Sequence, residues 1–533
     1  MNSKMLEERK KKYCLTDGTI GFSIDVAGMD FKDEDLNALS AKFADAHKEM
    51  IRIESGEIKN PDENRKVTHF TDRIAYPGTS LFADVQMFAE ELRTGLVKGC
   101  TGKAIENAVI NGIGGSALGP QLIQNAIRGP YWNELPAKKR KGFLRIYFLD
   151  NTDTAELKDL LDAVELDKTI LISISKSGGT QETKNNMIAF RHIYSKNNLD
   201  FAKHSCAVTM IGSELDKYSK AENWLRVFPL ADSIGGRTSE TSVVGHLPAA
   251  LAGIDFKSFL QGACHMDAWT REPDFRINPS YLLAAMWFIA GKGKGDKNMV
   301  IVPYSDRLIL LSRYLQQLVM ESLGKEKDLD GKTVHQGLNV FGNKGGTDAH
   351  AFIQQLNDGR NDFFVTFIEV LKDFINIPIE ENISMSDYLH GFLCGLSNAL
   401  LGKDREVIRM SVREMNEFNL GLLIALYERA VAYYAELVHI NAFHQPGVQA
   451  YKLASKSIIS LTKDIQVALR SIGQFSGTAK ELLAKAGLKA QASEAEGILA
   501  KFAENSSLRK FNGFKITREW NDEKGWVYEI TVL

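Results

Sequence analysis

The sequence predicts an α/β protein with two doubly wound parallel sheets, a helical N-terminal segment and a small α+β module at the C-terminus. Short β-branched runs alternate with helical stretches from residue 104 onward, as in a parallel sheet covered by helices on both faces. A second alternation follows the stretch 291–297, whose glycines and lysines indicate a boundary. The final part, from residue 476 on, combines two helical stretches with a hairpin pattern.

A chain of 533 residues is longer than one hydrophobic core normally supports, so several domains are expected. We expect an N-terminal helical segment, a first α/β domain, a second α/β domain and a C-terminal extension, at residues 1–95, 96–292, 293–455 and 456–533.

The composition excludes several classes of protein. The net charge of −2 argues against broad nucleic-acid binding. The longest apolar run, residues 281–290, is too short to span a membrane, and the polar residues 1–13 do not form a secretory signal. An odd number of cysteines without a CxxC pair favours reduced thiols in a cytoplasmic protein over disulfides or a metal site. The five cysteines are Cys14, Cys100, Cys206, Cys264 and Cys394.

The N-terminal segment reads as helical and mixed, and its charged residues are expected on solvated helix faces. The first alternation then predicts a sheet with ligands at the carboxyl ends of its strands. Its expected strands are 108–111, 145–150, 169–174 and 207–211. Its expected helices are one that the stretch 112–120 opens and that runs to about residue 128, and those at 154–164 and 181–194.

The most informative stretch, residues 173–183, follows the buried strand 169–174 and precedes a helix. It holds the hydroxyls of Ser175, Ser177 and Thr180, the cation of Lys176 and two glycines. Free backbone N–H groups and the positive end of the helix dipole make such a turn an anion site. A tight turn with an ordinary helix cap is the alternative. The stretch lacks the Lys-Ser/Thr ending of a nucleotide-binding P-loop.

Two further glycine-rich turns follow strands of the same region. Residues 112–119 match Gly-x-Gly-x-x-Ala, the glycine motif of dinucleotide sites. Such a site also needs an acidic residue about 20 positions after the motif, and Asp150, the acidic residue that ends the next strand, lies nearly twice that far away. The alternative is that Gly114, Gly115 and Ser116 let the backbone approach a sugar. In residues 233–245, Arg237 is either a fixed donor toward an anion or part of a surface salt bridge.

The second alternation predicts strands at 298–304, 363–369 and 409–413 and helices at 306–323 and 386–401. Residues 420–438 read as a long buried helix, and a linker at 441–447 leads into a helix through residue 452. The C-terminal module has expected helices at 476–486 and 494–503 and a hairpin of 514–520 with 525–532, as in a winged helix. The basic residues of this module are balanced by acidic ones, which favours a role in packing or in a dimer contact over DNA binding.

Six separated blocks occur in the order found in one family, across residues 112 to 452. They are Gly112–Pro120, Ser175–Thr183, Gly235–Ser239, Gln317–Lys325, Gly346–Phe352 and His444–Lys452. In these blocks the chain resembles the glucose-6-phosphate isomerase family. The resemblance does not cover the C-terminal module.

The resemblance implies two sugar-isomerase-type (SIS) sheets, a sugar phosphate as substrate, no cofactor or metal, and a homodimer with shared active sites. It makes Glu321 the base that moves a proton between C1 and C2. It makes His350, from the other subunit, a group that assists ring opening. Lys452 would act at the ring oxygen or hydroxyl, and Arg237 would stabilise the enediolate. The residues implied to bind substrate or phosphate are Gly115, Ser116, Ser175, Lys176, Ser177, Thr180, Gln317 and Gln445.

These residue types suit the chemistry. Isomerisation without a metal needs one base that takes a proton from carbon and returns it to the neighbouring carbon, and a carboxylate serves. A guanidinium stabilises the negative charge of an enediolate, and a remote phosphate supplies binding energy that places the reacting carbons. Three positions depart from the family pattern, Gly179, Leu323 and Ala349.

Three alternatives remain at this point. A dual phosphoglucose and phosphomannose isomerase is a close variant. A regulator that senses sugar phosphates would use the same sheets, with the tail as a DNA module, but would not need the combined set of Glu321, His350, Lys452 and Arg237. An NAD-dependent oxidoreductase is disfavoured by the distant Asp150.

Overall fold

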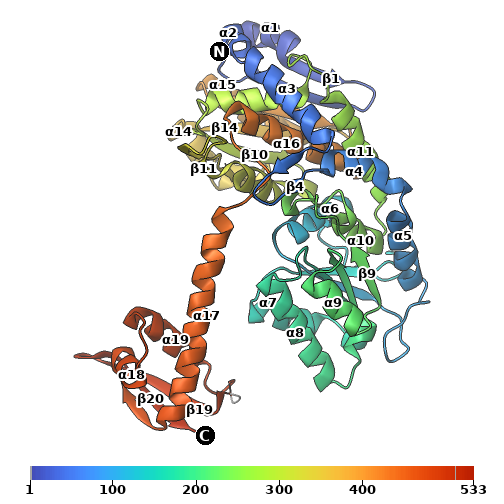
Figure 1. Ribbon diagram of the computed structural model, residues 1–533. Helices are drawn as coiled ribbons and strands as arrows, with labels where there is room; N and C mark the ends of the chain where they lie inside the picture. Colours follow the sequence, from blue (N-terminus) through green and yellow to red (C-terminus); the bar gives the residue numbers. More distant parts are fainter. Residues whose placement is uncertain (1–2, 510–511) are drawn as a thin grey trace. The chain divides into compact units, whose positions relative to one another are not determined.

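The computed structural model describes residues 3–509 and 512–533. By its internal contacts the chain divides into two compact units, one ending at His444 and one formed by Gln445–Leu533. Figure 1 shows the first unit as two α/β regions and the second as a long helix with a small mixed domain at its end.

The first sheet contains five strands, all parallel, in the order β6-β5-β7-β8-β9. Apolar side chains on one face of its strands pack against α7, α8 and α9, and those on the other face contribute to a core that includes α5, α6 and α10. This is the expected doubly wound arrangement. The strands are β5 (Asn107–Asn111), β6 (Arg145–Leu149), β7 (Thr169–Ile174), β8 (Ser205–Thr209) and β9 (Arg226–Pro229).

The helices of this region begin where capping residues and turns allow. Asp153 caps α7 and Ser213 caps α9, each through its side-chain oxygen. The segments are η2 (Gly114–Ser116), α6 (Leu118–Arg128), α7 (Thr154–Ala163), η3 (Leu166–Lys168), α8 (Gln181–Lys196), η4 (Phe201–His204), α9 (Glu214–Ala221), η5 (Gly236–Thr238) and α10 (Val243–Leu251).

The second sheet has the strand order β1-β2-β17-β14-β10-β13, and it is mixed, whereas a parallel sheet was predicted. Its four strands from β17 to β13 are parallel, but β1 and β2 form a hairpin that adds antiparallel to β17. The strands are β1 (Cys14–Asp17), β2 (Phe22–Gly28), β10 (Asn298–Tyr304), β13 (Val340–Phe341), β14 (Phe363–Val370) and β17 (Glu406–Val412).

The N-terminal segment is therefore less helical than predicted. Phe22, Ile24 and Val26 are fully buried at every second position of β2, and this alternation was the missed signal of a strand. The other segments are α1 (Ser3–Tyr13), α2 (Asp33–Ala38), α3 (Ser40–Glu54), β3 (Ile58–Asn60), β4 (Arg65–Lys66), α4 (His69–Ala75), η1 (Tyr76–Gly78) and α5 (Ser80–Arg93).

The centre of the first unit is formed by α11 (Phe256–Trp269), α12 (Pro279–Ala290) and α16 (Glu417–Leu437). The helix α16 is almost entirely buried, as its apolar sequence predicted. It also carries charges into this core. Arg73 donates two hydrogen bonds of 2.6 Å to Asp267 and pairs with Glu428, while the adjacent Arg429 donates to Asp267 at 2.7 Å. Such buried charges are tolerated because each finds an opposite charge.

The helix predicted over residues 306–323 is interrupted. It consists of η6 (Asp306–Leu308), α13 (Leu311–Leu315) and η7 (Gln316–Glu321), and η7 is a π-helix. Short π segments are wider than an α-helix and occur frequently at functional sites.

The remaining segments of the first unit lie between residues 325 and 402 of the chain. Apolar residues of α14 and α15 pack on one face of β10, β14 and β17. The segments are β11 (Lys325–Lys327), β12 (Thr333–Gln336), η8 (Thr347–His350), α14 (Ile353–Asp358), β15 (Pro378–Glu380), β16 (Ile383–Ser384) and α15 (Met385–Gly402).

The second unit has the element order of a winged helix, with a three-stranded sheet in the order β18-β20-β19. Ile465 and Leu469 of its first helix are buried in its core with Leu499 and Tyr528. The elements are α17 (Gly447–Ile472), β18 (Phe475–Gly477), α18 (Ala479–Ala486), α19 (Ala492–Glu504), β19 (Phe514–Asn521) and β20 (Gly525–Val532). The helix predicted from residue 476 begins at Ala479 instead, because Phe475–Gly477 form the short strand β18.

The helix α17 runs without interruption through the expected boundary between residues 455 and 456. The three boundaries between the four expected domains stay predictions. Among the described residues, no helix combines the length and the apolar character that crossing a bilayer requires.

Candidate functional site

Two turns and the π-helix η7, from distant parts of the chain, meet in the first unit. The turn η2 follows β5, η5 precedes α10, and η7 belongs to the second α/β region. A Cβ atom at Gly115 would lie 1.8 Å from the carbonyl oxygen of Gly236, and one at Gly114 would lie 3.0 Å from Nε2 of Gln317. The glycines of η2 therefore allow a backbone-to-backbone approach that no other residue allows.

Arg237 lies in the middle of η5 and is 6% exposed. Its Nε donates to Oγ of Ser322 at 2.6 Å, and its Nη2 donates to the carbonyl oxygens of Ala442 and His444. Burial lowers the pKa of Arg237, and the Glu321 carboxylate opposes that effect. The guanidinium is thus held by two segments that are distant in the chain, 321–322 and 442–444, so it is a fixed donor and not a surface charge.

Glu321 ends the π-helix η7, and its side chain is 22% exposed. Its Oε1 lies 3.7 Å from Nη1 of Arg237. The carboxylate and the guanidinium therefore share one small volume, which Gln317 also borders through its contact with Gly114. A carboxylate beside a fixed cation is a combination that can remove a proton from carbon and stabilise the resulting negative charge.

Lys325 is a further charged group at this place, and no role was predicted for it. It is 4% exposed, and its Nζ donates to the carbonyl oxygens of Glu321 at 2.8 Å and Ser322 at 2.7 Å. Burial, reinforced by the charge of Arg237, lowers its pKa to about 7. The sequence shows that Lys325 follows Glu321 by four residues, but it gave no indication that the side chain is buried.

The predicted anion-binding turn joins β7 to α8. Ser175 Oγ donates to Thr180 Oγ1 at 3.2 Å, and the N–H of Gly179 donates to the exposed Ser177 at 3.2 Å. Gly178 has φ +72°, and a Cβ there would lie 2.3 Å from the backbone nitrogen of Leu215, so the turn requires glycine at this point. The backbone of the turn opens onto the N-terminus of α8, as an anion site requires.

Lys176 connects this turn to the segment that carries Arg237. Its Nζ donates to the carbonyl oxygen of Ile234 at 3.0 Å and pairs with Asp232 at 3.1 Å. Burial lowers the pKa of Lys176. The turn from Ser175 to Thr180 and the segment that leads to η5 are thereby linked through one side chain.

Three of the predicted site residues are not brought to this place by described contacts. His350, the last residue of η8, is exposed, and no hydrogen bond or ion pair among the described residues joins its ring to Arg237 or Glu321. Gln445 and Lys452 belong to the second compact unit, and Lys452 is exposed on α17. The participation of these three residues stays a prediction.

Comparisons with known proteins agree on one family. The sequence model of the phosphoglucose isomerase family matches residues 30–413. The chain is 45% identical over 486 residues to the glucose-6-phosphate isomerase of Gloeothece citriformis, covering 89% of this chain and 90% of the relative. It is 46% identical over 474 residues to that of Trichormus variabilis, covering 86% and 88%. This chain belongs to the phosphoglucose isomerase family.

A solved structure supports the same conclusion. The crystal structure of a glucose-6-phosphate isomerase from Chlamydia trachomatis has a TM-score of 0.77 and 29% identity, covering 86% of this chain and 92% of that one. As a member of the phosphoglucose isomerase family, the chain is an enzyme of the aldose–ketose isomerase class. The expected family and the expected class of enzyme are confirmed.

Two further carboxyl groups of this phosphoglucose isomerase family member, those of Glu240 and Glu428, are buried, and Glu240 follows η5 closely in the chain. Tyr314 donates a 2.7 Å hydrogen bond to Oε1 of Glu240, which is 1% exposed. Burial raises the pKa of both Glu240 and Glu428. The Glu240 carboxyl interacts with that of Glu428, which in turn pairs with Arg73. Glu240 therefore connects the segment that follows η5 to the buried ion pairs of the core. Sequence reasoning gave no role to Glu240.

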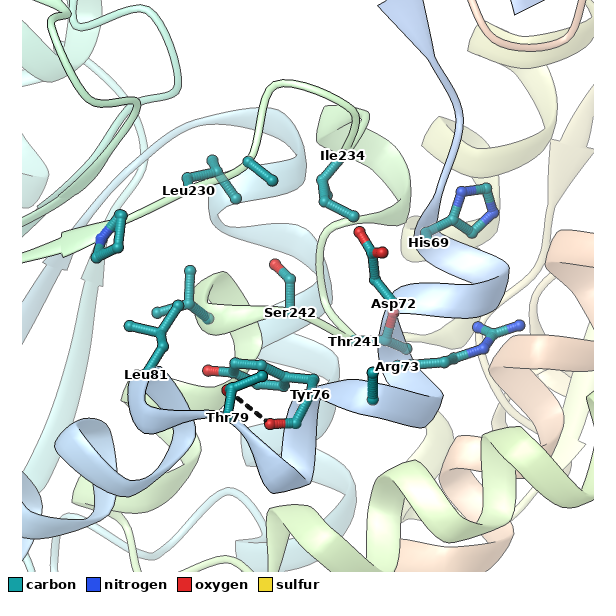
Figure 2. Close-up of a pocket in the computed structure, with 14 residues that line it drawn as sticks. His69, Asp72, Arg73, Tyr76, Thr79, Leu81, Leu230, Ile234, Thr241 and Ser242 are labelled. Atoms are coloured by element: carbon teal, nitrogen blue, oxygen red, sulfur yellow. Dashed lines mark hydrogen bonds between the residues drawn. The ribbon is translucent and has the colours of Figure 1, made fainter. Parts of the chain in front are cut away.

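A cavity of about 190 Å³ is lined in part by residues of the segment 229–243. Figure 2 shows Tyr76 and Thr79 on one side of it and Leu230 and Ile234 on the other. None of the predicted site residues lines it. Within the described part of the chain, no group of three or more His, Cys, Asp or Glu residues is arranged to hold a metal ion.

Proposed function

We propose that the protein interconverts glucose 6-phosphate and fructose 6-phosphate, a step of glycolysis and gluconeogenesis, through a cis-enediolate intermediate. The observation that carries this proposal is the meeting of Glu321 and Arg237 at 3.7 Å beside the glycine turn η2, in a chain of the phosphoglucose isomerase family. The curated relatives are named glucose-6-phosphate isomerase.

In this mechanism the Glu321 carboxylate removes the proton from C2 of the opened aldose and returns it to C1. The enediolate formed between these two steps carries negative charge on oxygen. Arg237 faces Glu321 and is held by Ser322 and two carbonyl oxygens, so it does not reorganise when that charge appears. Gln317, which contacts η2, lines the same place and is proposed to orient the sugar hydroxyls.

The phosphate is proposed to bind at the turn from Ser175 to Thr180. Hydroxyls of Ser175, Ser177 and Thr180, the N–H groups at the start of α8 and the charge of Lys176 supply the donors. Gly115 and Ser116 of η2 would contact the sugar between the phosphate turn and Glu321. Binding the remote dianion supplies energy that holds C1 and C2 against the base.

Ring opening is proposed to need three groups that lie outside the contacts described above. His350 and Lys452 would transfer protons at the anomeric hydroxyl and the ring oxygen, and Gln445 would line the site. These roles rest on the family motifs Gly346–Phe352 and His444–Lys452 alone. We expect the enzyme to act in the cytoplasm, whose reducing conditions suit five unpaired thiols.

The direct test is incubation of the purified protein with fructose 6-phosphate, without nucleotide or added metal, followed by detection of glucose 6-phosphate. Formation of glucose 6-phosphate supports the proposal, and its absence from folded protein contradicts it. Mannose 6-phosphate in the same assay measures whether the enzyme also accepts the C2 epimer.

We further propose that the enzyme is a homodimer in which His350 reaches the site of the other copy. The exposed position of His350 supports this proposal. Co-expression of Glu321→Gln and His350→Ala chains tests it, because a mixed dimer would contain one site with both residues intact. We expect recovery of roughly a quarter of wild-type activity from random pairing. If each His350 serves its own chain, mixing restores nothing.

A further inference from the structure

A cluster of reactive side chains lies apart from the proposed isomerase site, between α15 and the second sheet. Cys394 and His390 are four residues apart on α15 and therefore lie on one face of that helix. Glu369 of β14 and Arg409 of β17 face them from the sheet. None of these four residues has a role in the proposed isomerisation.

Contacts between polar atoms link the side chains of Glu369, His390, Cys394 and Arg409 one to the next. The His390 ring binds Oε1 of Glu369 through Nδ1 at 2.6 Å, and the thiol of Cys394 lies 3.4 Å from Nε2 of the same ring. Since a carboxylate only accepts, Nδ1 carries the proton in this contact, and Nε2 of the neutral ring is left to accept the thiol proton. This is the relation of nucleophile, base and orienting carboxylate found in activated thiols.

Arg409 adds a positive charge to the cluster. Its Nη2 lies 3.7 Å from Sγ of Cys394 and 3.6 Å from Oε2 of Glu369. A guanidinium beside a sulfur favours the thiolate, which is the reactive form. The cluster is also reachable from solvent, because Cys394 is half-buried and the His390 side chain is 58% exposed.

The other charged groups around the cluster lie on neighbouring elements. Tyr304 of β10 faces Cys394, Asp25 of β2 faces Arg409, and Asp387 on α15 faces His390. Burial raises the pKa of Tyr304 to about 12, so it is neutral near pH 7. The charges next to the sulfur are therefore those of Arg409 and, once it takes the thiol proton, His390.

The other cysteines provide a contrast within the same chain. Burial raises the pKa of Cys14, Cys206 and Cys264, which makes their thiols less reactive. Cys100 is exposed and has no hydrogen bond to its sulfur within the described part of the chain. It is therefore the natural internal reference for an ordinary accessible thiol.

We propose that Cys394 is a modification site, an activated thiol that reacts with hydroperoxides. In the first step the thiolate attacks the O–O bond; an S–O bond forms, the O–O bond breaks, sulfur is oxidised to a sulfenic acid and the peroxide is reduced to water or an alcohol. The proton held by His390 goes to the leaving oxygen. In the second step a low-molecular-weight thiol attacks the sulfur, an S–S bond forms and water leaves.

The test compares Cys394 with Cys100 in the same full-length protein. The protein is treated with hydrogen peroxide in the presence of dimedone, which traps sulfenic acids, and labelling at each cysteine is followed by peptide mass spectrometry. We expect Cys394 to be labelled at least about tenfold faster than Cys100 near pH 7. Labelling of Cys394 no faster than Cys100 would overturn the proposal.

Variants separate activation by the cluster from simple exposure. His390→Asn removes the base, and we expect the rate at Cys394 to fall to that of Cys100; Glu369→Gln, which no longer orients the ring, should lower it as well. His192→Asn changes an exposed histidine of α8 and serves as the matched control. An unchanged rate at Cys394 in both cluster variants would also reject the proposal. We expect Cys394→Ser to retain isomerase activity, because Cys394 has no role in the proposed isomerisation.

Discussion

The two sheets of the first unit contribute different kinds of group to the proposed site. The first sheet contributes mainly backbone, through the glycine turns around Gly115 and Gly178, with short hydroxyl side chains. The second contributes side chains, Glu321 and Gln317, from a helix that is wound as a π-helix. Binding an anion needs many N–H groups held in place, whereas moving a proton needs one carboxylate held at one position.

This difference predicts a division of kinetic effects. Changes at the second sheet should lower kcat, because they remove groups that act on the transition state, and changes at the phosphate turn should raise KM. Arg237 connects both regions, since it contacts Ser322 and Glu321 and its segment is held by Lys176. It should affect both parameters.

The largest effect is expected at the proposed base. Glu321→Gln keeps the shape of the side chain but removes the basic oxygen, and we expect kcat to fall by about 10³-fold or more with substrate binding largely intact. A coupled assay and a direct binding measurement check this. Glu326→Gln, at an exposed carboxylate of β11, is the matched control and should keep wild-type kcat. A near wild-type rate in Glu321→Gln would remove this residue from the mechanism.

The next effect is expected at the guanidinium. Arg237→Met loses the charge facing Glu321 and leaves the carbonyl oxygens of Ala442 and His444 without that donor. We expect kcat to fall by about 10²–10³-fold and KM to rise. The exposed Arg276→Met is the control. If Arg237→Met changed KM alone, the proposed contact with the developing charge would be wrong.

Contact between the two turns can be tested with one methyl group. Gly115→Ala places a Cβ 1.8 Å from the carbonyl oxygen of Gly236, so one turn must move, and we expect a loss of about 1–3 kcal/mol in the free energy of unfolding with lower kcat/KM. Gly236→Ala is the control, because a Cβ there meets nothing within 4 Å. Thermal unfolding and kinetics of both variants are compared; equal behaviour would contradict the close approach.

The phosphate turn should show the opposite kinetic signature. Ser175→Ala removes one donor to the anion, and we expect KM to rise by about tenfold with a smaller change in kcat. Inorganic phosphate should inhibit this variant more weakly than the wild type. Ser195→Ala, at an exposed position of α8, is the control. A lower kcat at unchanged KM would place Ser175 with the catalytic groups and blur the division between the sheets.

The smallest effect concerns stability as a function of pH. Burial lowers the pKa of Lys325 from 10.5 to about 7, so the unfolded chain binds this proton more tightly than the folded one. The resulting penalty is full below pH 7 and disappears as pH rises toward 10, so stability from this group increases with pH by on the order of a few kcal/mol. Chemical unfolding of wild type and Lys325→Met at several pH values measures the difference in slope. Equal slopes in the two proteins would show that folding does not lower the pKa of Lys325. Lys327→Met changes an exposed neighbour and is the control, and its stability should depend on pH as that of the wild type does.

Much of the fold could be read from local patterns. The predicted strands 169–174 and 298–304 match β7 and β10 in both ends, because each is a short apolar run closed by turn residues. The helix expected at 306–323 was only partly right, since hydrophobic spacing does not distinguish an α-helix from the wider π-helix at Gln316–Glu321. The hairpin of β1 and β2 was missed because its partner, β17, lies almost 400 residues away in the chain.

The sequence by itself determined the family, the two alternating α/β regions and the residue types of the site, because each is encoded in a contiguous motif. The tertiary structure alone decided that Gly115 touches Gly236, that Arg237 lies beside Glu321, that Lys325 is buried and that Cys394 has a histidine, a carboxylate and a guanidinium around it. These facts join segments far apart in the chain, and no local pattern records which distant segments pack together.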